Sequence, residues 1–83
     1  MVRSELNIRI RCGVRVFLEC HKGEYFTGKE IAFFLQDKLG MNKSTITANQ
    51  ISRLVKMDRT NINGILHVVD IKVMDGRNKY AIL

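Results

Sequence analysis

Two apolar stripes with helical spacing follow each other directly in the segment from Thr47 to Leu66. The first stripe is Ile51, Leu54 and Val55, and the second is Ile62, Ile65, Leu66 and Val69. Each stripe has its own helix start signal, because Thr47 and Gln50 form a capping box and Asp58 can cap the helix that follows. The segment therefore predicts two short crossing helices joined by a turn at Met57.

Residues 27–39 predict another helix. Thr27 and Glu30 form a second capping box, and Gly40 stands where a helix would end. The apolar positions form one face, made of Ile31, Phe34, Leu35 and Leu39.

The last residues predict a β-hairpin with a basic tip. Apolar and polar residues alternate after Val69 and again up to the C-terminus, on both sides of Asp75-Gly76-Arg77-Asn78, which has turn chemistry. The β-branched segment Ser44–Thr47 also predicts a short strand.

Residues 4–21 fit two structures. A half-buried strand would alternate through Ile8, Ile10, Cys12, Val14, Val16 and Leu18. A helix after a Ser4 cap would place Leu6, Ile10, Val14, Phe17 and His21 on one stripe. The periodicity does not decide between helix and strand. We expect residues 1–22 to form an extra N-terminal element, which is either a dimer surface or a core helix of the domain.

From residue 27 onward the predicted order is helix, short strand, helix, turn, helix, strand, turn, strand. This order resembles the winged helix-turn-helix superfamily of DNA-binding domains, common among bacterial and archaeal transcription regulators, and the resemblance is sharpest from Ile51 to Leu66. It implies one α+β domain over residues 1–83, with a three-helix core, a C-terminal two-stranded hairpin wing and the extra N-terminal element. Lys56 departs from the glycine often found in the family's turn, at a cost of about 1 kcal/mol.

The resemblance implies that a helix over residues 59–69 is the recognition helix in the major groove. Its outward residues are Arg59, Thr60, Asn61, Asn63, Gly64 and His67. Arg59 suits guanine and Asn63 suits adenine, whereas a glycine within a helix indicates a close backbone approach. The expected phosphate contacts are Thr47, Asn49, Arg53 and Lys56, and the expected wing contacts are Arg77, Asn78 and Lys79. A plain polar face and a solvated turn are the structural alternatives.

A second register is also consistent with the sequence. In it, residues 4–21 are the first helix, 27–39 the second and about 43–57 the recognition helix, and the hairpin begins from Ile65. This register explains the N-terminus and Gly40 better, but it leaves Thr47, Gln50 and Asp58 without capping roles. We favour the first register.

Charge points to a polyanionic partner. The chain has 83 residues, with 14 Lys and Arg against 8 Asp and Glu, for a net charge of +6. Each neutralised phosphate releases counterions and strengthens binding, so we expect double-stranded DNA, bound by a homodimer. A winged helix can instead bind protein or RNA. A DNA binder should gather cations on one face, whereas an interaction module should expose an apolar patch.

Other classes of function are not expected. The sequence has no paired carboxylates, no histidine with an obvious Asp or Ser partner and no Gly-rich phosphate loop, so we predict no enzyme, cofactor or small-molecule substrate. Cys12, Cys20, His21 and His67 lack paired zinc spacing, and we expect no metal, reduced core thiols and surface histidines. The chain has no run of about 18 apolar residues that would span a membrane, so we expect a cytoplasmic protein.

Overall fold

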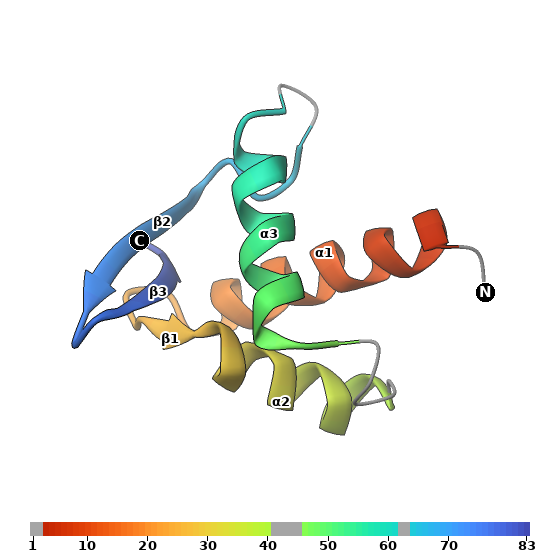
Figure 1. The fold of residues 1–83 in the computed structure, drawn as a ribbon, viewed down its shortest axis with the longest axis horizontal. Helices are drawn as coiled ribbons and strands as arrows, with labels where there is room; N and C mark the ends of the chain where they lie inside the picture. The colour runs from red at the N-terminus through yellow and green to blue at the C-terminus, as the bar shows by residue number, and fades with distance from the viewer. Residues whose placement is uncertain (1–2, 41–45, 62–63) are drawn as a thin grey trace.

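The computed structural model describes residues 3–40, 46–61 and 64–83 of the chain. Within these ranges it contains three helices and three strands, namely α1 (Arg3–Cys20), β1 (Phe26–Thr27), α2 (Gly28–Leu39), α3 (Ala48–Arg59), β2 (Val69–Met74) and β3 (Arg77–Ile82). The strands form one antiparallel sheet in the order β1-β3-β2. In Figure 1, α3 crosses in front of α1 and the sheet lies at the end of the molecule opposite the N-terminus. The predicted α+β class is confirmed, and the arrangement is compatible with a winged helix.

Residues 4–21 fold as a helix and not as a strand. The face of α1 turned to the core carries Ile10, Val14, Phe17 and Leu18, all buried. Cys12 and Val16, which a strand would place on the same face as Ile10 and Val14, are exposed, as a helix requires. Cys12 and Cys20 lie on the outer side and are exposed, so the prediction of core thiols is wrong.

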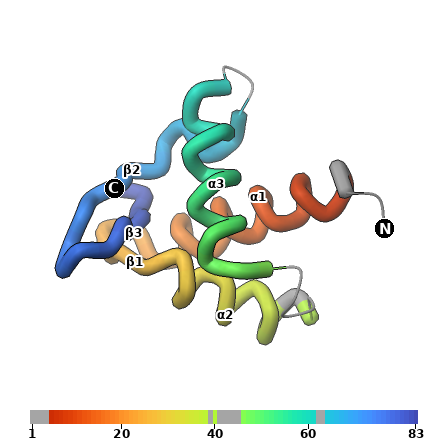
Figure 2. The backbone as a smooth tube through the Cα atoms, in the orientation of Figure 1, coloured from red at the N-terminus to blue at the C-terminus, as the bar shows by residue number. Residues whose placement is uncertain are grey.

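The start of α2 is capped as its sequence predicts. The Thr27 side chain accepts a hydrogen bond from the Glu30 N–H at 3.1 Å, and Glu30 Oε1 accepts one from the Thr27 N–H at 3.0 Å. Gly40 ends the helix in a left-handed conformation with φ 62°. Gly28 lies against the start of α3, because a Cβ atom on it would come within 3.0 Å of the Ala48 carbonyl oxygen. The N-termini of α2 and α3 therefore meet; Figure 2 follows the backbone through this region.

The helix predicted over residues 59–69 is wrong. Thr47 caps α3 by accepting from the Gln50 N–H at 3.2 Å, but the helix ends at Arg59 and residues 64–68 are not helical. Asp58 does not cap a following helix, since it lies buried in the last turn of α3 and accepts from the Leu66 N–H at 2.6 Å. This contact folds the chain back along α3.

The predicted short strand before α3 is not seen where it can be tested. Ile46 and Thr47 are not in a strand, and Ser44 and Thr45 lie outside the described residues. Ile46 is buried, and its carbonyl oxygen accepts a hydrogen bond from the Gln36 amide at 2.9 Å. A side chain of α2 therefore satisfies the backbone here.

The predicted C-terminal hairpin is confirmed. Asp75 and Gly76 both have positive φ, 55° and 74°, as a two-residue hairpin turn requires. Val69 pairs with Ile82 and Ile71 with Tyr80. The sequence did not predict the third strand, β1, which pairs with the outer side of β3 through Phe26 and Thr27.

Candidate nucleic-acid interface

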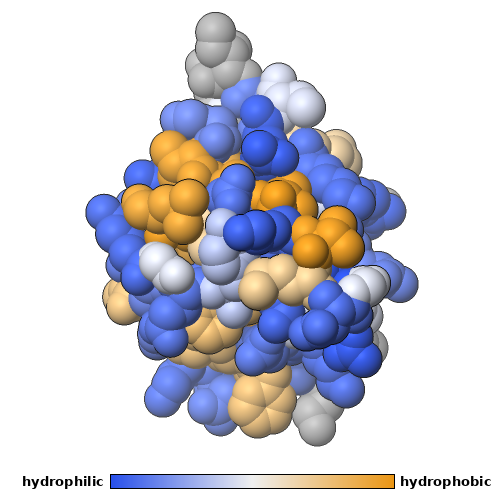
Figure 3. Space-filling view, turned by 90° about the vertical axis from the view of Figure 1, so that its left-hand side faces the viewer, coloured by the Kyte–Doolittle hydropathy of each residue, from blue (hydrophilic) through white to orange (hydrophobic). Residues whose placement is uncertain are grey.

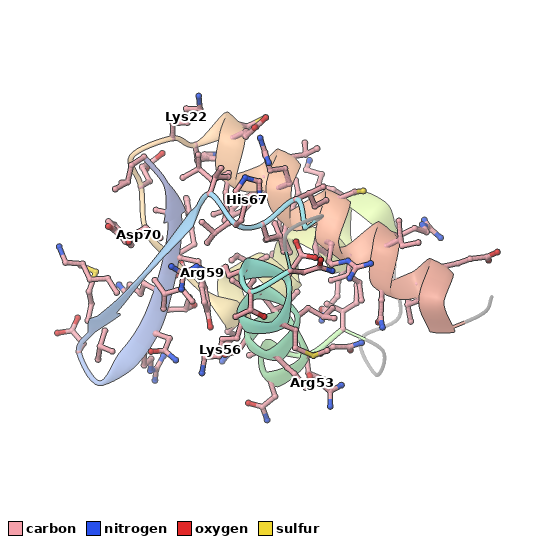
Figure 4. The ribbon with its side chains drawn as sticks, turned by 90° about the horizontal axis from the view of Figure 1, so that it is seen from above. Lys22, Arg53, Lys56, Arg59, His67 and Asp70 are labelled. Atoms are coloured by element: carbon pink, nitrogen blue, oxygen red, sulfur yellow. The ribbon has the colours of Figure 1, made fainter. Side chains whose placement is uncertain are left out.

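The outer side of α3 carries a polar, basic stripe. Its inner side buries Ile51, Leu54, Val55 and Asp58. Asn49, Arg53 and Lys56 are exposed and follow each other at spacings of four and three residues, so they share the opposite side of the helix. Figure 4 shows Arg53 and Lys56 on the side of α3 turned away from α1. We call Asn49, Arg53 and Lys56 the α3 stripe.

A polar groove lies next to the α3 stripe. It has a volume of about 390 Å³ and is lined by Thr27, Gly28, Lys29, Ala48, Asn49, Ser52, Arg77, Asn78 and Tyr80. Its three walls are therefore the start of α2, the first turns of α3 and the strand β3. The Tyr80 hydroxyl donates a hydrogen bond to Ser52 Oγ at 2.8 Å, which ties β3 to α3 at the groove. Tyr80 and Ser52 both line the groove, so the hydrogen bond that holds two of its walls together is part of the groove.

The hairpin adds further cations beside this groove. Arg77 and Lys79 line a second hollow, of about 430 Å³, together with Lys29 and with the acidic Glu30 and Asp75. Glu30 is already engaged with the Thr27 N–H as a helix cap. The walls of the groove and of this hollow therefore bring together cations from α2 and β3.

Asp70 and Lys72 on β2 both contact Tyr25, the residue before β1. The Tyr25 hydroxyl donates a hydrogen bond to Asp70, and the Lys72 Nζ lies 5.6 Å from the centre of the Tyr25 ring. The hydrogen bond to Asp70 raises the pKa of Tyr25 above its usual 10.0, and burial and the Asp70 charge act in the same direction. Tyr25 therefore stays a neutral hydrogen-bond donor at ordinary pH.

Arg59 and His67 lie together at the C-terminal end of α3. They line a hollow of about 510 Å³ at the other end of α3, together with Lys22 and Asp70. Figure 4 places Arg59 on the side of α3 that faces the sheet. His67 Nδ1 is 2.7 Å from the Gly64 carbonyl oxygen. These two predicted site residues therefore line a different hollow from the groove beside Asn49, although Arg59 lies only three residues after Lys56 on the same helix.

The other residues expected on a recognition helix belong to the loop after α3. Thr60 donates its hydroxyl to the Met57 carbonyl oxygen at 2.8 Å, and the Asn61 N–H donates to the Asp58 carbonyl oxygen at 3.1 Å. Gly64 is buried. Asn63 lies outside the described residues. The close backbone approach expected at Gly64 is present, but the surface it approaches is Asp58 of the same chain.

Of the predicted contacts, Asn49, Arg77 and Asn78 line the groove, Arg53 and Lys56 stand on the stripe, and Thr47 caps α3. Sequence reasoning missed Lys29 and Ser52. The signal for both was present, because the capping boxes at Thr27 and Thr47 place Lys29 in the first turn of one helix and Ser52 in the second turn of the other. That α2 and α3 start side by side is what brings them together.

From the sequence we expected a DNA binder to gather cations on one face and an interaction module to expose an apolar patch. The structure has both features. Cations gather along α3 and the hairpin, and an aromatic hollow lined by Phe17, Phe26, Phe33 and Phe34 lies beside α2, with Lys29 shared between this hollow and the groove. Figure 3 shows the sheet end, where hydrophilic atoms cover most of the surface and apolar atoms form separate groups. Among the described residues, no group of three His, Cys, Asp or Glu side chains could hold a metal ion.

Comparison with known protein families, characterised proteins and solved structures finds no match to this chain. No helix in the described part of the chain has both the length and the apolar character to cross a membrane.

Proposed function

We propose that this chain binds double-stranded DNA as a winged helix-turn-helix domain, with α3 in the major groove and the β2–β3 hairpin as the wing. The observation that carries the proposal is the α3 stripe beside a groove whose far wall is Arg77 and Asn78. This assignment uses the second of the two registers, in which residues 4–21 and 27–39 are the first and second helices. The observed bounds of α1 and α2 agree with that register. The third helix differs from it, because α3 runs over Ala48–Arg59 with Thr47 as its cap, whereas the register expected a helix over about 43–57 and no capping role for Thr47.

The side chains of the stripe suit the edges of bases. Arg53 can offer two parallel N–H groups to guanine, and Asn49 matches the donor and acceptor pair of adenine. Lys56 is a compact charge better suited to a phosphate. These side chains project from an element whose other side is buried, so their positions are set by the core.

The groove and hairpin suit the DNA backbone. Arg77 and Lys79 supply positive charge, and Asn78 and Ser52 supply neutral hydrogen-bonding groups. Phosphate contacts of this kind fix the position of a protein on the DNA but do not recognise the base sequence. The net charge of +6 acts in the same direction.

The test is titration of the protein with random-sequence duplex DNA at several salt concentrations. With about four phosphate contacts, the logarithm of the affinity should fall with the logarithm of the salt concentration at a slope of about −3 to −4. The Arg53→Ala/Lys56→Ala double variant should bind more weakly and with a shallower slope. The matched control is Lys22→Ala/Lys38→Ala, which removes two exposed lysines away from the stripe and should leave the slope unchanged. Absence of binding at low salt would overturn the proposal.

A further inference from the structure

All four phenylalanines of the chain line one hollow. Phe17, Phe26, Phe33 and Phe34 surround a volume of about 480 Å³ together with Lys29, Glu30 and Asp37. The Phe17 ring lies 4.4 Å from the Phe34 ring and 4.7 Å from the Phe26 ring, measured between centroids. The floor of this aromatic hollow is therefore packed.

Phe33 is not packed like the other three. It leaves 69% of its surface exposed, whereas Phe17 is buried and Phe26 and Phe34 are partly buried. The inner side of α2 buries Ile31, Ala32 and Leu35, so Phe33 stands on the side of the helix without a partner in the fold. Large exposed aromatic side chains of this kind are typical of protein interfaces.

The charges around Phe33 are arranged symmetrically along α2. Lys29 lies four residues before Phe33 and Asp37 lies four residues after it, and all three are exposed. Positions four residues apart share one face of a helix. One face of α2 therefore carries a cation, an aromatic ring and an anion at equal intervals.

We propose that the aromatic hollow is covered by a second copy of this chain, with the two α2 helices antiparallel about a two-fold axis at Phe33. In this arrangement Phe33 meets Phe33 of the partner subunit, and Lys29 meets Asp37 of the partner subunit twice. A two-fold interface needs a surface that is complementary to itself, and a stripe with opposite charges equidistant from its apolar centre meets that condition. Glu30 does not disturb the pairing, because it caps its own helix at the Thr27 N–H.

The outer side of α1 is less suited to the same role. It exposes Ile8 and Val16, and a two-fold axis midway between them, at Cys12, would bring Glu5 opposite Glu19 of the partner subunit. Like charges that face each other disfavour association. The charge pattern therefore places the self-association surface on α2 and not on the N-terminal element.

Sedimentation velocity over a range of protein concentrations tests the interface. We expect the full chain to dimerise with a dissociation constant below about 100 μM, and Phe33→Glu to raise that constant at least about tenfold. Val73→Glu is the matched control, since Val73 on β2 is also 69% exposed and lies outside the hollow; it should leave the constant unchanged. A wild-type chain that stays monomeric at about 200 μM, or a dimer that Phe33→Glu does not weaken, overturns the proposal.

A charge swap tests the pairing directly. Asp37→Lys should weaken the dimer, because it brings two lysines together at each end of the interface, and Lys29→Asp/Asp37→Lys should restore the constant to within about threefold of wild type. Circular dichroism confirms that each variant is folded. Failure of the double variant to restore the dimer overturns the two-fold pairing. None of these measurements involves DNA, so the interface and the proposed function stand or fall separately.

Discussion

Gly64 lies so close to Asp58 that a Cβ atom on Gly64 would sit 2.3 Å from the Asp58 carbonyl oxygen and 2.8 Å from its carboxylate Oδ2. The loop after α3 therefore folds directly back onto the last turn of the helix. Arg15 holds the loop from the side of α1 by donating to the Ile65 carbonyl oxygen at 2.6 Å. Because α3 ends at Arg59 and the loop turns back, His67 does not continue the α3 stripe.

Gly64→Ala should destabilise the fold by about 2–3 kcal/mol, because the added methyl group meets a backbone carbonyl that cannot move without displacing α3. Urea unfolding monitored by circular dichroism measures the change. Gly28→Ala is the comparison, since its Cβ would meet the Ala48 carbonyl oxygen at 3.0 Å and should cost less. Equal stability of the two variants would contradict the packing of the loop on Asp58.

Asp58→Ala should cost about 2–3 kcal/mol of unfolding free energy, since it leaves the buried Leu66 N–H without its acceptor. It also removes the partner of Arg11, whose guanidinium lies 3.5 Å from the carboxylate but is partly exposed to water. Asp58→Asn keeps an acceptor oxygen and should cost less, about 1 kcal/mol. Thermal unfolding of the three proteins gives the order, and an Asn variant as unstable as the Ala variant would show that the charge, which both variants remove, matters more than the acceptor oxygen.

Arg53→Ala should weaken binding to a preferred DNA duplex by about tenfold or more, because a two-pronged contact to guanine contributes about 1–3 kcal/mol of discrimination. Arg59→Ala should change the affinity less than about threefold, since Arg59 lines a hollow with Asp70 at the C-terminal end of α3 and does not line the groove. Fluorescence anisotropy at constant salt compares the two. A larger loss for Arg59→Ala than for Arg53→Ala would contradict the assignment of the base contacts to Arg53 and Asn49.

Tyr25 should ionise above its usual pKa of 10.0, because its hydroxyl donates to the Asp70 carboxylate. A raised pKa in the folded state means that Tyr25 stabilises the fold fully below pH 10 and loses this contribution as the pH rises through the higher folded value. NMR of the ¹³C-labelled tyrosine ring measures the titration. Asp70→Asn should lower the pKa of Tyr25 toward 10.0, whereas Asp75→Asn at the hairpin turn should leave it unchanged.

Several local structures could be predicted from neighbouring residues alone. The Thr27 and Glu30 pair starts α2, Gly40 ends it, and Asp75-Gly76 makes the hairpin turn. Each of these structures depends on backbone groups within four residues, so contacts with distant residues have little effect on it. The groove residues Asn49, Arg77 and Asn78 were predicted for the same reason, because they lie beside such signals.

The sequence by itself determined where α2 and α3 begin, where α2 ends and where the hairpin turns, because these depend on short-range caps and on positive φ. Only the tertiary structure decided that residues 4–21 are a helix, since their apolar residues fit both periods until the core selects Ile10, Val14 and Phe17. It also decided that residues 60–61 and 64–68 are not helical. The Asp58 carboxylate could cap a new helix locally, but its partners are Leu66, eight residues ahead, and Arg11 on α1. Contacts at that separation cannot be inferred from the spacing of nearby residues, so only the fold showed that the helix predicted over residues 59–69 does not form.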